Sequence, residues 1–155
     1  MKDMKKEYEL LISQLKGFLE EEDLLAALCN GCALLKEEVS DLNWVGFYFA
    51  REKDLVLGPF AGKVACTHIA YGKGVCGTAY EKQETLLVRD VHEFPGHIAC
   101  DSASNSEIVV PLKEKIGVFD IDSPLTARFG EEEKQLFETA AELFSVRILQ
   151  GERTF

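Results

Sequence analysis

The sequence predicts an α+β fold: a single antiparallel sheet with helices packed on one face and a loop-capped pocket on the other. Two segments near the N-terminus and one near the C-terminus have the apolar spacing of amphipathic helices. The segments between them are short and rich in aromatic and β-branched residues, which is typical of strands. Helices that flank a run of strands indicate a layered domain, and 155 residues are enough to bury one core.

Three long helices are expected. Residues 3–20 and 22–38 have apolar side chains at i, i+3, i+4 and i+7, the spacing of a helix with one buried face. Asp23 is a suitable N-cap for the second helix, because its carboxylate can accept a hydrogen bond from a free amide of the first turn. The residues from Gly130 onward form the third amphipathic pattern.

The strands are expected between these helices, beginning with a hairpin of residues 43–50 and 54–60. A short helix over residues 75–81 is expected to begin through Gly74. The other expected strands are 64–69, 85–88, 107–112 and 115–122. Pro111 belongs at a sheet edge or a strand end, because proline has no N–H to donate to a ladder.

Composition argues against several classes of function. With 27 acidic and 17 basic residues the net charge is −10, and nucleic-acid binding depends on Lys and Arg that neutralise phosphates. No apolar run approaches the roughly 18 residues of a membrane span. The charged N-terminus also lacks a signal-peptide pattern. We therefore expect a cytoplasmic protein without a nucleic-acid or membrane partner, whose thiols are kept reduced.

The five cysteines are then expected to be core residues, metal ligands or redox-active thiols rather than a disulfide framework. Cys66, Cys76 and Cys100 lie in a turn-rich stretch, residues 66–122, that also contains all three histidines. Within it, the long polar segment 90–106 carries Cys100 between two apolar segments. Long loops inside compact domains are often functional, so this stretch is the candidate site.

Two local motifs have a structural explanation. Cys29 and Cys32 have C-x-x-C spacing, but they fall within an expected helix and Cys32 lies on its apolar face, which favours packing. The G-x-G-x-x-G pattern at 72–77 resembles a dinucleotide fingerprint, which requires a βαβ unit. Because antiparallel segments surround it, we interpret it as a turn and a helix start. That helix N-terminus would favour a thiolate at Cys76.

A zinc site is another interpretation of the same stretch. Zinc ligands usually come in pairs with C-x(2–4)-C or H-x(3–5)-H spacing. The available ligands fit such pairs only loosely, so we expect no metal. They are Cys66, His68, Cys76, His92, His97 and Cys100.

The residue types leave two interpretations of the thiols open. Chemistry on a sulfoxide or a peroxide needs a nucleophilic thiolate and a second thiol that resolves the sulfenic acid as a disulfide. Cys66, Cys76 and Cys100 lie at element edges or in loops, where thiols can be reached, and could supply both. They could also be inert thiols in a binding module.

Three carboxylates accompany these cysteines. Asp120 and Asp122 alternate on one expected strand and so project to the same face, and Glu107 opens the neighbouring strand. If the three share a pocket, their repulsion raises the pKa of at least one, which then stays protonated near neutral pH. The alternative is that Asp120 and Asp122 end a strand that turns into Ser123 and Pro124.

Several motifs together resemble the free methionine-(R)-sulfoxide reductase family, whose members are GAF-domain enzymes. The resemblance covers most of the chain, from the second helix to the last. It implies that residues 1–155 form a single GAF domain with a GAF-like antiparallel sheet. The motifs are WVGFY at 44–48, LGPF at 57–60 with Gly62 and Lys63, GVCGT at 74–78, DVHEFPGHIACD at 90–101, SEIVVP at 106–111 and DIDSP at 120–124.

The resemblance also implies a reaction, the thioredoxin-dependent reduction of free L-methionine (R)-sulfoxide to L-methionine without a bound cofactor. Cys100 matches the cysteine that attacks sulfur and becomes the sulfenic acid. Cys66 matches the principal resolving cysteine, and Cys76 a second cysteine able to join disulfide exchange. Trp44 and Tyr48 match the aromatic wall of the family's substrate pocket.

Glu107, Asp120 and Asp122 match the family's pocket carboxylates, and chemistry supports these roles. A thiolate attacks a sulfoxide readily only when the oxygen receives a proton or a hydrogen bond, which a protonated Glu107 can supply. Asp120 and Asp122 suit the ammonium group of a free amino acid. Trp44 offers a flat apolar wall for the S-methyl group.

Two rival classes stand against the enzyme: a non-catalytic GAF module that senses a small ligand, and a structural domain stabilised by zinc. Sensory GAF domains usually belong to longer chains with output domains, which leads us to expect the enzyme. A homodimer is compatible with the exposed helical layer that the pattern predicts.

Overall fold

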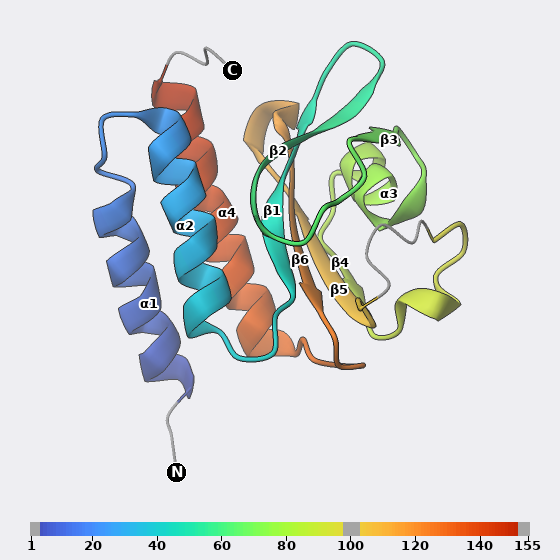
Figure 1. Ribbon diagram of the computed structural model, residues 1–155, viewed down its shortest axis with the longest axis horizontal. Helices are drawn as coiled ribbons and strands as arrows, with labels where there is room; N and C mark the ends of the chain where they lie inside the picture. Colours follow the sequence, from blue (N-terminus) through green and yellow to red (C-terminus); the bar gives the residue numbers. More distant parts are fainter. Residues whose placement is uncertain (1–3, 98–102, 152–155) are drawn as a thin grey trace.

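The computed structural model describes residues 4–97 and 103–151, which form three layers (Figure 1). The first layer contains the three long helices α1 (Met4–Phe18), α2 (Leu24–Glu38) and α4 (Glu131–Gln150). The second is a sheet, and the third contains the short helix α3 (Gly74–Lys82) with its neighbouring loops. The predicted α+β class is confirmed.

The described residues form a six-stranded antiparallel sheet in the order β3-β2-β1-β6-β5-β4. Strands β1 and β6 occupy the centre, where both faces of the sheet are covered. The strands are β1 (Trp44–Ala50), β2 (Asp54–Gly62), β3 (His68–Ala70), β4 (Leu86–Val88), β5 (Ser106–Pro111) and β6 (Gly117–Ser123).

The predicted helices are confirmed, with ends that differ by a few residues. Asp23 caps α2 as expected, because its Oδ1 accepts a hydrogen bond from the amide of Ala26 at 2.9 Å. The predicted hairpin is β1 and β2. No helix in the described part of the chain has the length and apolar character needed to cross a membrane.

Two predicted strand boundaries are wrong. The third strand was expected to begin at Val64, but residues 63–67 form a loop and β3 begins only at His68. The carbonyls of Lys63 and Cys66 in this loop accept from side chains, not from a neighbouring strand. Strand β6 begins at Gly117 and not at residue 115, because Glu114 and Lys115 adopt positive φ in a tight turn.

The larger apolar core lies between the sheet and the long helices. Phe47 of β1 packs its ring 5.1 Å from Phe119 of β6 and 4.9 Å from Phe144 of α4. These three side chains are fully buried. The prediction of helices on one face is confirmed for α1, α2 and α4, whereas α3 lies on the pocket face (Figure 1).

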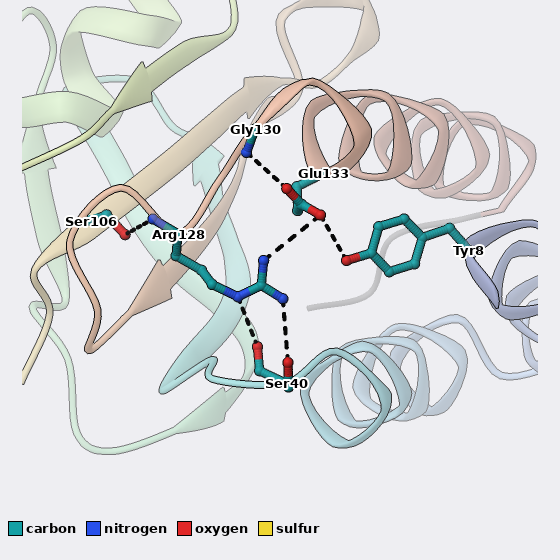
Figure 2. A network of polar contacts seen from close by, with 6 residues as sticks. All are labelled: Tyr8, Ser40, Ser106, Arg128, Gly130 and Glu133. Carbon is teal, nitrogen blue, oxygen red and sulfur yellow. Dashed lines mark hydrogen bonds and ion pairs between the residues drawn. The ribbon is translucent and has the colours of Figure 1, made fainter. Parts of the chain in front are cut away.

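A polar network joins the helices to the start of β5, where Ser106 Oγ accepts a hydrogen bond from the amide of Arg128 at 3.4 Å (Figure 2). Glu133 of α4 accepts from the amide of Gly130 at 2.8 Å and from the hydroxyl of Tyr8 at 2.8 Å. Arg128 lies 3.7 Å from the same carboxylate and donates to Ser40, just after α2. Burial and then the hydrogen bond to Glu133 raise the pKa of Tyr8 to about 12. Glu133 therefore links α1, α4 and the segment that follows α2.

We predict that Glu133→Ala lowers the free energy of unfolding by about 2–4 kcal/mol, because it removes the acceptor of the buried Tyr8 hydroxyl and of the Gly130 amide and takes away the carboxylate beside Arg128. Chemical denaturation at neutral pH measures the loss. Glu132→Ala is the matched control, since Glu132 lies in the same first turn of α4 but is exposed. Equal losses for the two variants would show that the helix terminus, and not the network, is responsible.

Candidate active site

Strand register brings three carboxylates together on the second face of the sheet. Glu107 of β5 pairs with Asp122 of β6, and Asp122 also pairs with Trp44 of β1. Asp120, two residues before Asp122, projects to the same face. The carboxylates are 5–8% exposed, so all three are buried. β6 ends at Ser123, directly after Asp122, as the alternative expected, but Asp120 and Asp122 also line the cavity on this face.

The short helix α3 closes one side of this site. It begins at Gly74, whose φ of +61° favours glycine. Its third residue, Cys76, places Sγ 4.0 Å from Glu107 Oε2. Ligand atoms of Cys76, Glu107 and Asp120 all lie within 4.8 Å of one another. A thiol and two carboxyl groups therefore meet in one buried space.

Aromatic rings form the opposite wall. The rings of Trp44 and Tyr48 stack with centroids 5.8 Å apart, and the ring of Phe60 also stacks on Trp44, with centroids 5.2 Å apart. Gly46 lies beneath the Trp44 ring, where a Cβ would be 2.7 Å from Trp44 Cη2 and 2.3 Å from Phe60 Cβ. Only glycine at position 46 leaves room for the indole, so the Trp44 ring packs closely against the backbone of β1.

These groups line one cavity, together with two polar residues that the sequence analysis did not assign to the substrate pocket. One is His97, which was considered only as a zinc ligand, and the other is Ser104, just before β5. The cavity has a volume of about 40 Å³, room for a few water-sized groups. The residues in the lining are Trp44, Tyr48, Ala65, Ile69, Gly74, Val75, Cys76, His97, Ser104, Glu107, Asp120 and Asp122.

Burial dominates the electrostatics of the cavity. Burial and then the nearby Asp120 raise the pKa of Glu107 well above its ordinary value of 4.5. Burial and then Asp122 raise the pKa of Asp120 in the same way. Asp120 Oδ1 has no hydrogen-bond partner among the described residues, although it is buried. The site therefore favours protonated carboxyl groups, as expected from their predicted proximity.

Cys76 differs from its prediction. It was expected to be accessible and to favour a thiolate at a helix N-terminus, yet its side chain is only 4% exposed. Burial, followed by Asp120 and Glu107, raises the pKa of the Cys76 thiol. The helix N-terminus is present, but desolvation and the neighbouring carboxyl groups outweigh it. Cys76 is a protonated thiol in the resting site.

The other cysteines fall into distinct environments. Cys32 is buried with Sγ 3.8 Å from the Pro59 carbonyl and Cys29 is exposed, so the C-x-x-C pair does not face one pocket. Cys66 lies half-buried in the β2–β3 loop and is disulfide-bonded, whereas Cys29, Cys32 and Cys76 are free. Cys100, the predicted nucleophile, lies outside the described residues.

The histidines of the predicted zinc alternative do not assemble around a shared centre in the described part of the chain. His68 lies at the surface, 3.0 Å from Asp54, and His92 lies at the surface, 2.9 Å from Asp90. His97 lines the cavity but does not belong to the cluster of Cys76 with the carboxyl groups. Two of the three histidines are therefore surface residues that pair with an aspartate.

The raised pKa of Glu107 predicts a pH-dependent stability. A carboxyl group with a raised folded-state pKa contributes its full stability below pH 4.5, and that stability is lost as the pH rises through the raised value. We expect Glu107→Gln to be more stable than the parent by about 1 kcal/mol or more at pH 8, and similar at pH 4. Thermal melting across this range measures the difference.

The control for this comparison is Glu84→Gln, because Glu84 is exposed and lies outside the cavity. The difference in stability between Glu84→Gln and the parent should not grow with pH. A Glu107→Gln protein that is less stable than the parent at pH 8 would mean that the buried group is ionised and well solvated.

Comparison with known proteins agrees with this geometry. Residues 19–148 match the GAF domain family. The chain is 54% identical over 118 residues to the free methionine-R-sulfoxide reductase of Escherichia coli (74% of this chain, 72% of the relative). It is 50% identical to protein YtsP of Bacillus subtilis (96% of this chain, 94% of the relative).

A solved structure shows the same fold with a ligand in place. The free methionine-R-sulfoxide reductase of Neisseria meningitidis, in complex with its substrate, superposes with a TM-score of 0.90 at 41% identity. The match covers 96% of this chain and 92% of that chain. The chain therefore belongs to the GAF domain family and, within it, to the free methionine-(R)-sulfoxide reductases.

Proposed function

We propose that this protein reduces free L-methionine (R)-sulfoxide to L-methionine. The observation that carries the proposal is the buried trio Glu107, Asp120 and Asp122, which lines one cavity with the Trp44 ring. An acidic, desolvated pocket with a flat apolar wall suits a ligand that has both an ammonium group and an apolar end. Relatives that carry this activity in their names support the choice of ligand.

The ammonium group is proposed to bind at Asp120 and Asp122. A cation beside Asp120 would lower the pKa of that carboxyl group, which is raised in the resting site, so binding would restore the carboxylate. The buried Asp120 Oδ1 would gain a partner at the same time. Binding would thus be favoured by the relief of a buried, unsatisfied acceptor.

Glu107 is proposed as the acid for the sulfoxide oxygen. Its raised pKa keeps a proton available near neutral pH. The attacking thiolate gives two electrons to the substrate sulfur, the sulfur–oxygen bond breaks, and the oxygen ends on the enzyme as a sulfenic acid. One proton is consumed in this step, and Glu107 would supply it.

The cysteines are proposed to act in sequence. Cys100 would attack the sulfoxide, and Cys66 would then attack the sulfenic sulfur, forming a disulfide and releasing the oxygen as water. The disulfide-bonded state of Cys66, among free thiols at Cys29, Cys32 and Cys76, supports its role as the resolving thiol. Cys76, buried beside Glu107, could join disulfide exchange only after the site opens.

Thioredoxin is the proposed reductant, because Cys66 lies half-buried in a surface loop that a protein dithiol could approach. We further propose that residues 1–155 act as one GAF domain in the cytoplasm. A homodimer through the helical layer is also proposed. Leu10 of α1, 62% exposed, and Phe18, 43% exposed, supply apolar surface for it.

Cysteine variants test the proposed sequence of steps. Without reductant, Cys100→Ser should form no methionine from free methionine (R)-sulfoxide. The double variant Cys66→Ser with Cys76→Ser should form one equivalent and stop, because its sulfenic acid has no resolving thiol. Cys29→Ser should behave as the parent. Amino-acid analysis of quenched samples measures methionine, and one full equivalent from Cys100→Ser would contradict the assignment of the nucleophile.

The alternative function is a GAF module that senses a small ligand without catalysis. Adding free methionine sulfoxide distinguishes this module from the enzyme. The enzyme, reduced beforehand, loses two free thiols and releases methionine when free methionine sulfoxide is added. A sensor binds without either change.

A further inference from the structure

The β2–β3 loop, residues 63–67, is attached to the aromatic wall of the pocket. Tyr48 donates its hydroxyl proton to the carbonyl of Cys66 at 2.9 Å, and Trp44 donates Nε1–H to the carbonyl of Lys63 at 3.2 Å. The amide of Leu57 donates to the carbonyl of Thr67 at 3.0 Å. Two of these three anchors are therefore side chains that also line the substrate cavity.

Packing holds the Tyr48 hydroxyl in one position. Tyr48 is 2% exposed, and its ring stacks on Trp44, which also stacks on Phe60. Burial and then Asp120 raise the pKa of the Tyr48 hydroxyl, so it remains a hydrogen-bond donor at neutral pH. A rigid donor can define the position of the loop residue that it holds.

We propose that the Tyr48 hydroxyl positions Cys66 for the second half of the reaction. The inference rests on the proposed function, in which Cys66 resolves the sulfenic acid. In that step a sulfur–sulfur bond forms and the sulfur–oxygen bond of the sulfenic acid breaks. The hydroxyl oxygen takes up the proton of the Cys66 thiol and leaves as water. Tyr48 does not touch the reacting atoms in this step. It holds the backbone from which the resolving thiol projects.

Tyr48→Phe removes one buried hydrogen bond that holds the loop. Its effect on the rate of the resolving step depends on that bond and on how precisely the two sulfur atoms must be placed. Such a bond changes the population of a loop position about 2- to 12-fold. A displacement of about 1 Å in a reacting group can cost far more, up to roughly 100-fold. For Tyr48→Phe we therefore expect the resolving step to slow by about 10-fold.

The experiment is a single turnover of the pre-reduced protein without reductant, with samples quenched over time. Methionine and the loss of one thiol report the first step, loss of a second thiol reports the resolving step, and dimedone traps sulfenic acid for mass spectrometry. Tyr48→Phe should accumulate trapped sulfenic acid while methionine has already formed. The rate of the second step is read directly, whatever happens to the first.

Tyr80→Phe is the matched control, because the Tyr80 hydroxyl also donates to a backbone carbonyl, that of Lys115, away from the cavity. It should resolve its sulfenic acid at the parent rate. Placing 4-aminophenylalanine at position 48 keeps an N–H donor there and should restore resolution. If Tyr48→Phe loses its fold, 4-fluorophenylalanine at position 48 provides the same comparison with the hydroxyl volume kept.

The outcomes separate this inference from the proposed function. A parent protein that forms no methionine, or a Cys66→Ser protein that resolves at the parent rate, overturns the proposed function. When both behave as proposed and Tyr48→Phe still resolves its sulfenic acid at the parent rate, only the positioning role of Tyr48 is overturned.

Discussion

The site depends on the burial of three carboxyl groups by the pairing of β5, β6 and β1. Glu107 and Asp122 face each other across two strands, and Asp120 follows the same face of β6. Ionising such a group in a buried position costs several kcal/mol, so the resting cavity favours protons on Glu107 and Asp120. The same burial makes the cavity ready for a cationic ligand and supplies an acid beside it. Binding and proton donation thus have one physical origin.

The remainder of the fold supports this unfavourable arrangement. On the opposite face of the sheet, aromatic side chains of β1, β6 and α4 form a dense apolar core, and the network around Glu133 ties the helices together. On the pocket face, α3 and the aromatic wall exclude water from the carboxyl groups. Excluding water strengthens electrostatic interactions inside, but it also suppresses the reactivity of Cys76. Functional sites commonly retain such locally destabilising groups because activity requires them.

Much of the fold and part of the site could be predicted from the sequence. Helical spacing located α1, α2 and α4, and alternation along β6 correctly placed Asp120 and Asp122 on one face. Local patterns did not reveal that residues 63–67 form a loop, because side-chain donors from β1 decide it. The burial of Cys76 was not predicted, because the sequence around a helix N-terminus does not show which distant residues pack against it. The stacking of Phe60 on Trp44 was not predicted, although Phe60 belongs to the LGPF motif and Gly46 makes room for both rings.

The central claim is that Glu107 holds a proton in the buried site and gives it to the sulfoxide oxygen. The most direct test is the single-turnover rate of methionine formation as a function of pH, for the parent and for Glu107→Gln. The parent rate should contain a limb that falls as the pH rises through the raised pKa of Glu107. Glu107→Gln should lack that limb and react about 100-fold or more slowly at neutral pH. A Glu107→Gln protein with the rate and the pH profile of the parent would contradict the account.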